Sequence, residues 1–226
     1  MTHGPINLAV LVSGSGTTLQ NLIDAIASRQ LDARIGLVIG SRPDIRALDR
    51  ARAAGIPAHV VDRRQFPDLA SFSRRVFELI DAAGVDLVCL AGWLCLLEIP
   101  ARWQGRVMNI HPALLPSFGG KGMYGRRVHE AVLAHGCKVS GCTVHFVDQN
   151  YDSGPIILQR TCPVLEDDTP DTLARRVFEQ EKIAYPQAIR LFASGRLRIE
   201  GRRVRIVGPD AGSRELAGEP DGGGSV

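Results

Sequence analysis

The sequence predicts an α/β fold built on a doubly wound, mostly parallel sheet with an antiparallel C-terminal part. Two observations indicate this fold. Short apolar runs of strand length alternate with segments of helical periodicity from the first residues onward, which is typical of strands covered by helices on both faces. The 226 residues are 45% hydrophobic and 23% charged, the composition of a globular chain that can form one large domain. A Rossmann-like sheet of this kind binds ligands beyond the carboxyl ends of its strands.

The N-terminal half predicts four strands separated by three helices. The first helix has a clear apolar face, since Leu19, Leu22, Ile23 and Ile26 fall at helical spacing. Gly55 is placed to end the second helix, because glycine readily adopts the left-handed conformation that follows many helices. The predicted strands are Ile6–Val12, Ala33–Ile39, Ala58–Val61 and Asp86–Leu90, and the predicted helices are Thr18–Arg29, Ala47–Ala54 and Leu69–Ala83.

The C-terminal half predicts a mixed continuation of the same sheet. Two strand-like runs are joined by the polar turn DQNYDSG. An arginine-rich segment closes this half and predicts an exposed hairpin at the sheet edge, since charge runs usually mark solvated surface. The predicted strands are Arg106–Ile110, Ser140–Val147 and Pro155–Val164, the helices are Arg127–Ala134 and Thr172–Phe192, and the hairpin is Arg196–Arg205.

Composition narrows the class of protein further. We expect one domain over residues 1–207 and a disordered tail over residues 208–226, which are rich in glycine, proline and charge. No apolar run reaches the ~20 residues of a membrane span, and the N-terminus lacks the pattern of a secretory signal. The net charge of +3 is too balanced to indicate a nucleic-acid partner. Five cysteines without a C-x-x-C pair argue against a disulfide framework and a zinc ribbon, so we expect a cytoplasmic protein.

A glycine loop, SGSGTT, joins the first strand to the first helix. It matches neither G-x-G-x-x-G nor a Walker A loop. Gly14 and Gly16 would let the backbone approach a ligand, and Thr17 and Thr18 would present amides at a helix N-terminus, where the helix dipole favours an anion. The loop therefore predicts a monophosphate site; a tight turn with a threonine cap is the structural alternative.

Asn109 and His111 are two residues apart at a predicted strand end, so their side chains share one face. An amide and an imidazole at such a place can hold a developing oxyanion, although an Asn-x-His pair taken by itself favours a loop histidine with a capping neighbour. Asp152 reaches His111 only if the sheet brings the later turn alongside. In that case, the carboxylate would favour the imidazolium and raise the pKa of His111. Loops after the first, fourth and fifth strands are expected to converge on one cleft.

Five segments of the chain carry a family resemblance. VSGSGTTLQNLI, LAGWLCLL, NIHPALLPSF, GCTVHFVDQNYDSGPIILQ and EKIAYPQAI occur in this order. The pattern, from about Ile6 to Val207, resembles the phosphoribosylglycinamide formyltransferase family, folate-dependent enzymes of purine biosynthesis. The resemblance implies transfer of a formyl group from 10-formyltetrahydrofolate to the amine of glycinamide ribonucleotide, with no metal. It places phosphate binding in the N-terminal half, and folate binding and catalysis in the C-terminal half.

At the positions that match the family's motifs, the resemblance also implies roles for individual residues. Asn109, His111 and Asp152 would be catalytic, and Thr143 would place a hydroxyl near them. His145 is either a further supporting side chain or a packed core histidine. The remaining implied contacts are Gly16, Thr17, Thr18 and Glu181 to glycinamide ribonucleotide, and Leu94, Cys95, Leu96, Leu97, Asn109, Asp148, Gln149, Asn150, Tyr151 and Asp152 to the folate.

Two departures from the family pattern concern the folate. Cys95 and Leu69 stand where family members can carry basic residues, so contacts to the acidic tail of the folate would need a substitute, for which Arg63 or Arg64 is near in sequence. The glycine-rich, basic loop Gly119–Arg127 is expected to lie over the site, and neither its Lys121 nor the following His129 is assigned a catalytic role.

Three alternatives remain. Methionyl-tRNA formyltransferase and formyltetrahydrofolate deformylase share the NIHP-x-LLP motif, but each usually adds a domain for which the sequence outside residues 6–207 gives no indication. The third alternative is a non-catalytic nucleotide-binding module. The partners expected are the two small molecules, without nucleic acid or membrane, in a monomer or homodimer.

Overall fold

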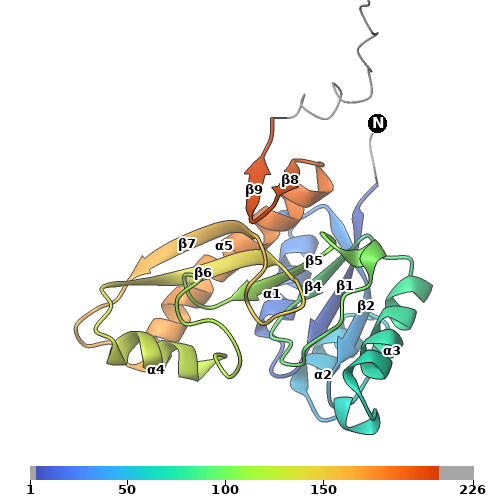
Figure 1. Ribbon diagram of the computed structural model, residues 1–226, viewed down its shortest axis with the longest axis horizontal. Helices are drawn as coiled ribbons and strands as arrows, with labels where there is room; N and C mark the ends of the chain where they lie inside the picture. Colours follow the sequence, from blue (N-terminus) through green and yellow to red (C-terminus); the bar gives the residue numbers. More distant parts are fainter. Residues whose placement is uncertain (1–3, 209–226) are drawn as a thin grey trace, which may run out of the picture.

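A nine-stranded sheet runs through the part of the chain that the computed structural model describes, residues 4–208 (Figure 1). Its order is β3-β2-β1-β4-β5-β6-β7-β9-β8. The first five strands along the chain pair in parallel, whereas β6 is antiparallel to β5 and β7. The predicted fold class is confirmed. The strands are β1 (Ile6–Val12), β2 (Ala33–Gly40), β3 (Ala58–Val60), β4 (Leu87–Leu90), β5 (Val107–His111), β6 (Val139–Phe146), β7 (Ile156–Pro163), β8 (Leu197–Glu200) and β9 (Arg203–Ile206).

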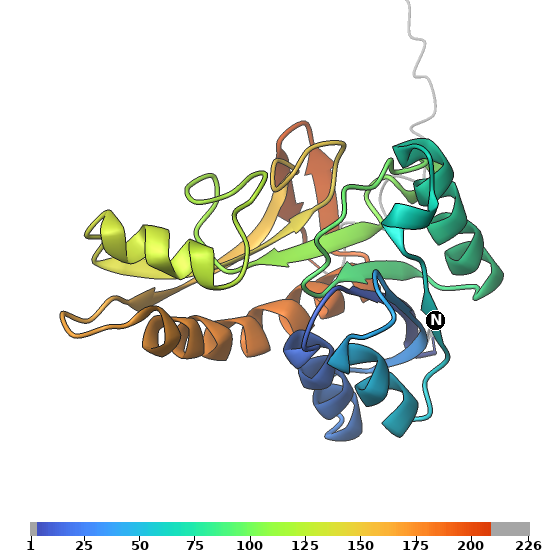
Figure 2. The same cartoon turned by 90° about the horizontal axis from the view of Figure 1, so that it is seen from below.

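Helices cover both faces of the parallel part of the sheet. The α-helices are α1 (Thr17–Ala27), α2 (Arg46–Ala53), α3 (Leu69–Ala82), α4 (Arg126–Ala134) and α5 (Pro170–Ala193). Side chains alternate along β1, so Leu8 and Val10 join the core cluster of α1, α2 and α5, whereas Ala9 and Leu11 join that of α3. Figure 2 shows α3 across the sheet from α1 and α2. Because both faces are covered, β1 is apolar almost throughout.

The carboxyl ends of β1, β4 and β5 lie side by side. Leu11 pairs with Leu90, and Leu90 pairs with Asn109. The backbone N–H of Ser13 donates to Gly92 O at 3.1 Å, which ties together the loops that follow β1 and β4. The convergence of these loops, expected from the sequence, is confirmed.

The predicted elements agree with the observed ones to within one or two residues at each end. Two 3₁₀ helices, Arg63–Gln65 and Ala101–Trp103, were not predicted, since segments this short carry no periodicity. The arginine-rich hairpin is β8–β9 and forms the predicted exposed sheet edge. No helix within residues 4–208 is long and apolar enough to cross a membrane. Apart from Gly208, the predicted tail lies outside the described residues.

Candidate active site

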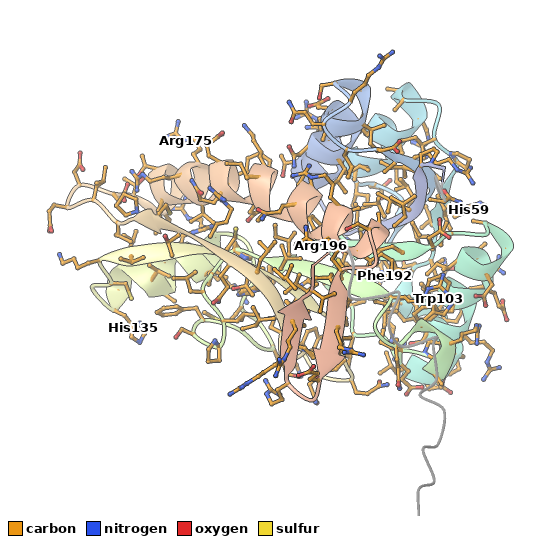
Figure 3. The ribbon with its side chains drawn as sticks, turned by 90° about the horizontal axis from the view of Figure 1, so that it is seen from above. His59, Trp103, His135, Arg175, Phe192 and Arg196 are labelled. Carbon is orange, nitrogen blue, oxygen red and sulfur yellow. The ribbon has the colours of Figure 1, made fainter. Side chains whose placement is uncertain are left out.

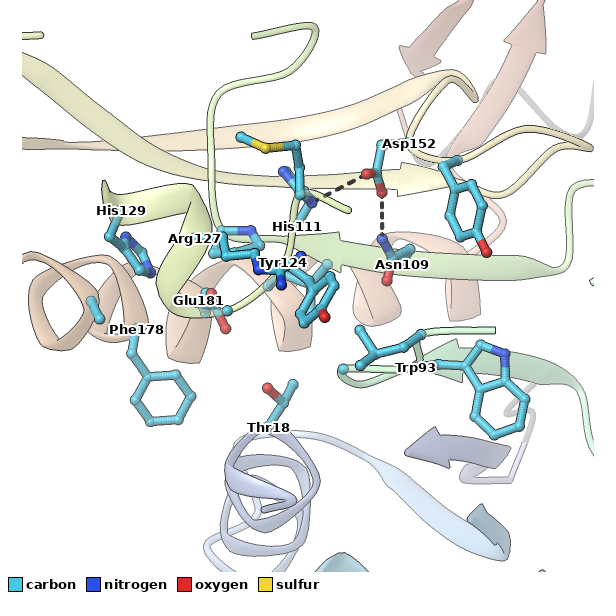
Figure 4. Close-up of a pocket in the computed structure, with 18 of the residues that line it drawn as sticks. Thr18, Trp93, Asn109, His111, Tyr124, Arg127, His129, Asp152, Phe178 and Glu181 are labelled. Atoms are coloured by element: carbon cyan, nitrogen blue, oxygen red, sulfur yellow. Dashed lines mark hydrogen bonds and ion pairs between the residues drawn. The ribbon is translucent and has the colours of Figure 1, made fainter. Parts of the chain in front are cut away.

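A cavity of about 670 Å³ opens at the carboxyl edge of the sheet. It is bounded by the start of α1, the loops after β4 and β5, the 120–125 loop, the turn after β6, and α5 (Figure 4). Of the residues predicted to bind or react, Thr17, Thr18, Leu94, Asn109, His111, Tyr151, Asp152 and Glu181 line it. The sheet thus brings together segments more than a hundred residues apart.

Asn109, His111 and Asp152 meet in this cavity. The Asp152 carboxylate accepts a hydrogen bond from Asn109 Nδ2 at 3.3 Å through Oδ1, and its Oδ2 lies 3.5 Å from His111 Nδ1 (Figure 4). Asn109 and His111 project from β5 on one face, as their spacing predicts. The sequence predicts contact between Asp152 and His111 only if the sheet brings their segments together, and the structure shows that it does.

The backbone fixes the position of Asp152. Its φ is 54°, and the N–H of Gly120 donates to its Oδ2 at 2.9 Å, which links the 120–125 loop to the carboxylate. A side chain at Gly154 would overlap the Phe146 carbonyl, so the turn needs glycine there. Burial raises the pKa of Asp152, but the polar groups around the carboxylate, among them the donating N–H of Gly120, lower it by more, so the net pKa lies below its ordinary value. Asp152 is therefore ionised at neutral pH.

The net pKa shift of His111 is opposite to the predicted one. Asp152 does raise the pKa of His111, as predicted, but burial lowers it by more, so the net pKa is below the ordinary value. His111 Nε2 donates to the Phe118 carbonyl at 2.8 Å, and Nδ1 faces Asp152. Two acceptors flank the ring, a geometry suited to an imidazolium, yet desolvation keeps the ring neutral at rest.

His145 lies in the site as well as in the core. In the β5–β6 register it pairs with Asn109. Its Nδ1 donates to the Phe146 carbonyl at 2.8 Å, which leaves Nε2 as an acceptor 3.1 Å from Asn109 Nδ2. The two amide hydrogens of Asn109 are thus directed at His145 and Asp152, and the amide is held from both sides.

Thr143 supports the loop that follows His111. Its buried hydroxyl donates to the Ala113 carbonyl at 2.7 Å and accepts from Leu115 N at 3.0 Å and Gln159 Nε2 at 2.9 Å. The hydroxyl is therefore one step away from the catalytic cluster, and it fixes the backbone on which His111 depends.

The glycine loop presents backbone N–H groups to the cavity that no side chain caps. Gly16 is the N-cap of α1 with φ 72°, and no side chain caps the helix, so the threonine-capped turn is not observed. A Cβ at Gly16 would lie 2.7 Å from Ala47 Cβ, which explains why the loop requires glycine where it crosses α2. Thr17 and Thr18 line the cavity, whereas Gly16 does not.

Glu181 enters the same cavity from α5. Burial raises its pKa to about 8, and its carboxylate has no hydrogen bond or ion pair within residues 4–208. Because a buried carboxyl group without a partner is unfavourable, a ligand that donates a hydrogen bond to it is bound more tightly.

The residues expected to hold the folate gather only in part. A second cavity of about 40 Å³ is lined by Cys95, Leu96, Leu97, Asn109, Asn150, Tyr151 and Asp152, together with Leu90, Trp93, His145 and Val147. Gln149 turns away and donates to the Ile99 carbonyl at 3.4 Å, and Asp148 accepts from Ser153 Oγ at 2.7 Å. These last two side chains shape the turn instead of lining the cavity.

The possible substitutes for a basic residue differ in availability. Arg64 forms an ion pair with Asp62 at 2.6 Å. Arg63 lies over the Phe72 ring at 5.8 Å and donates to the Phe66 carbonyl. Unlike Arg64, it forms no ion pair within residues 4–208. Arg63 is therefore the more available of the two.

Several cavity residues were not predicted from the sequence. Among these are Trp93 and Phe178, which line the larger cavity, whereas Tyr124 and Arg127 belong to the Gly119–Arg127 segment that was expected to lie over the site. Arg127 lies over the Tyr124 ring at 5.2 Å. The spacing of Phe178 and Glu181, one turn apart on α5, was a usable signal. The position of Trp93 depends on the path of the irregular segment after β4, which periodicity does not predict. Within residues 4–208, no group of three or more His, Cys, Asp or Glu side chains is arranged for a metal ion.

Comparisons with known proteins all find formyl transferases. Residues 6–189 match the family model described as formyl transferase. The chain is 42% identical over 201 residues to the trifunctional purine biosynthetic protein adenosine-3 of Bos taurus, covering 88% of this chain but 19% of that protein, so it spans about a fifth of such relatives. It is 37% identical to phosphoribosylglycinamide formyltransferase of Haemophilus influenzae, covering 89% of this chain and 93% of that one.

Solved structures extend the likeness. Glycinamide ribonucleotide transformylase 1 from Symbiobacterium toebii superposes with a TM-score of 0.84 at 47% identity, over 90% of this chain and 95% of that one. A formyltetrahydrofolate deformylase from Pseudomonas syringae reaches a TM-score of 0.79 at 23% identity, over 90% of this chain and 66% of that one, which shows a shared fold.

Proposed function

The chain belongs to the formyl transferase family, and we propose that it transfers the formyl group of 10-formyltetrahydrofolate to the amine of glycinamide ribonucleotide, in de novo purine biosynthesis. The observation that carries the proposal is the cluster of Asn109, His111 and Asp152 where the two cavities adjoin. One cavity suits a phosphorylated amine and the other adjoins the segments expected to hold a folate.

Glycinamide ribonucleotide occupies the larger cavity in this proposal. Its phosphate binds the amides of Gly16, Thr17 and Thr18 at the start of α1, where the helix dipole stabilises an anion. Glu181 contacts the middle of the nucleotide, and the amine reaches Asp152. The order phosphate, sugar, amine follows the order of these side chains from Thr18 to Asp152 in Figure 4.

The folate enters from the side of the smaller cavity. Backbone groups of Leu94–Leu97 and of the 148–152 turn bind the pterin, so the change to Cys95 is tolerated. A pterin ring needs more room than this cavity offers, and the half-exposed Tyr151 is the side chain placed to move. Arg63 supplies the cation for the acidic tail of the folate, in place of a basic residue at Leu69.

The reaction begins when the amine nitrogen attacks the formyl carbon and a tetrahedral oxyanion forms. Asn109 keeps its hydrogen bond to His145 and turns its other N–H from Asp152 to the oxyanion, an interaction worth ~2.7–4 kcal/mol at comparable sites. Asp152 accepts the proton that leaves the amine. His111 Nδ1, 3.5 Å away, takes that proton and returns it to N10 of the folate as the C–N10 bond breaks. No metal takes part, because the amine is itself a nucleophile.

The same proposal covers the organisation of the protein. The described chain functions as one domain, with the phosphate site in its N-terminal half and the folate site and catalytic cluster in its C-terminal half. The protein acts in the cytoplasm on two small molecules, without nucleic acid, as a monomer or homodimer.

The test is an assay with both substrates. The purified protein should convert 10-formyltetrahydrofolate to tetrahydrofolate only when glycinamide ribonucleotide is present, as followed by folate absorbance, with formylated nucleotide identified by mass spectrometry. Release of formate without nucleotide would instead identify a deformylase. Absence of both products under conditions in which a known formyl transferase is active would overturn the proposal.

A further inference from the structure

His129 is a buried polar side chain that the proposed reaction does not use. It stands on α4, is 4% exposed and lines the larger cavity (Figure 4). Its Nδ1 is fully enclosed and has no hydrogen-bond partner. Nε2 has no partner within residues 4–208 either, and it is the ring nitrogen that remains accessible from the cavity. Buried imidazoles normally have a partner, so this one lacks something that a ligand can supply.

The surroundings of His129 define its donor and acceptor character. Burial, followed by the nearby charge of His111, lowers the pKa of His129, so the ring is neutral at neutral pH. An N–H on the enclosed Nδ1 would have no acceptor, which disfavours that tautomer. The proton therefore belongs on Nε2, and His129 presents an N–H donor to the cavity.

Glu181 presents the complementary group to the same cavity. Its carboxyl group comes from α5, which packs against α4, and it too has no partner within residues 4–208. The proposed function already places the phosphate on the amides at the start of α1, and an ammonium group would suit Glu181 but not His129. A hydroxyl group suits both, since it accepts one hydrogen bond and donates another.

We infer that His129 is a positioning residue for the nucleotide: its Nε2–H donates to a ribose hydroxyl whose own hydrogen is donated to Glu181. This inference rests on the proposed function, because it assigns one further contact to glycinamide ribonucleotide. The pair fixes the sugar between the phosphate at Thr17 and Thr18 and the amine at Asp152. His129 touches no reacting atom, so its effect falls on nucleotide binding and leaves the chemical step unchanged.

Three substitutions at His129 separate this role from a structural one. His129→Leu should raise KM for glycinamide ribonucleotide about three- to tenfold, the effect of one lost hydrogen bond, and leave kcat and KM for the folate within about twofold. His129→Gln should keep KM near the wild-type value, because its amide nitrogen can take the place of Nε2. His129→Asn, whose amide instead matches Nδ1, should behave like the leucine variant. These polar variants keep the test open if His129→Leu does not fold.

The control is His59→Leu, an exposed histidine on β3 at the far end of the molecule from α4, whose last turn leads to His135 (Figure 3). It should leave both KM values unchanged. Thermal melting of each variant shows whether folding is affected.

The 2′-deoxy and 3′-deoxy forms of glycinamide ribonucleotide identify the hydroxyl. With one of these analogues, kcat/KM of the wild-type protein should be about threefold or more lower than with glycinamide ribonucleotide. For His129→Leu, the ratio of kcat/KM with glycinamide ribonucleotide to kcat/KM with that analogue should be at least about threefold smaller than for the wild type. Equal losses in wild type and variant for both analogues, or an unchanged nucleotide KM in His129→Leu, would overturn the inference. A wild-type protein with no transfer to glycinamide ribonucleotide would overturn the proposed function instead.

Discussion

The Asp152 carboxylate is the side chain on which the proposed chemistry depends most. It comes from a turn 41 residues beyond the end of β5, yet it lies within 3.5 Å of polar atoms on both Asn109 and His111. Its pKa is lowered, so it stays ionised throughout the range in which the substrate amine loses its proton. A loss of rate between pH 8 and pH 5 would accordingly arise from the amine or from His111.

Asp152→Asn should lower kcat about 100-fold or more, the usual contribution of a positioned acid–base group, with both KM values changed less than about threefold. The amide keeps the shape of the carboxylate but cannot accept the proton from the amine. Steady-state kinetics with both substrates measures the effect, and the exposed Asp167→Asn serves as the control. An Asp152→Asn variant with kcat within threefold of the wild type would contradict the catalytic role.

The raised pKa of Glu181 leads to a prediction about how stability depends on pH. Its pKa is about 8 in the folded protein and 4.5 when unperturbed, so between these pH values the folded state holds a proton that the unfolded state has lost. Stability then decreases as pH rises from about 4.5 to 8. Glu181→Gln removes this dependence.

The melting temperature of Glu181→Gln minus that of the wild type should therefore grow from pH 5 to pH 8 and level off above it, as measured by scanning calorimetry without ligand. A difference that stays constant from pH 5 to pH 8 would show that the carboxyl group titrates normally. The same variant should bind glycinamide ribonucleotide more weakly if the proposed contact is correct.

From the sequence, those parts of the site could be predicted in which the reactive side chains lie close together along the chain. Asn109 and His111 share a strand, so their common orientation follows from the alternation of side chains. The meeting with Asp152 and the position of His145 depend on the register of β5 with β6, which joins distant segments and leaves no local signal. The sign of the net pKa shift at His111 could not be predicted, because it is set by burial in the folded protein.

Among the elements, α5 links the catalytic edge to the rest of the sheet. Its Tyr185 is fully buried, and the hydroxyl oxygen lies 3.0 Å from Leu90 O and 3.1 Å from Met108 O. One hydroxyl hydrogen can thus be shared between carbonyls of the neighbouring strands β4 and β5. The periodicity of α5 predicts the helix, but not which of its side chains connects these strands.

Tyr185→Phe should lower the free energy of unfolding by about 1–3 kcal/mol, because it leaves buried carbonyl groups without a donor and changes little else. Chemical denaturation measures this difference. Tyr124→Phe, a change at an exposed tyrosine, should alter stability by less than about 0.5 kcal/mol. Equal stability of Tyr185→Phe and the wild type would mean that the hydroxyl contributes nothing to the junction of β4 and β5.

Within residues 4–208, two core clusters lie on opposite faces of one sheet. The larger cluster includes side chains of α1, α2 and α5, and the smaller one those of α3 and both tryptophans, Trp93 and Trp103. The fold class followed from alternating patterns along the chain. The attachment of the β8–β9 hairpin did not, since β7 and β9 are joined through a single pair, Ile156 and Arg203, which long-range packing selects.

Because the two clusters share the strands β1, β2, β4 and β5, residues 4–208 should unfold as one cooperative unit, as the single-domain prediction requires. Tryptophan fluorescence reports the α3 face, and far-UV circular dichroism is weighted toward α5, the longest helix described, on the other. The two denaturation curves should coincide. Ile189→Ala, a fully buried change on α5, should cost about 2–5 kcal/mol and shift both curves equally. A variant that shifts the ellipticity but leaves the tryptophan transition in place would show two units that unfold independently, and the single-domain prediction would be wrong.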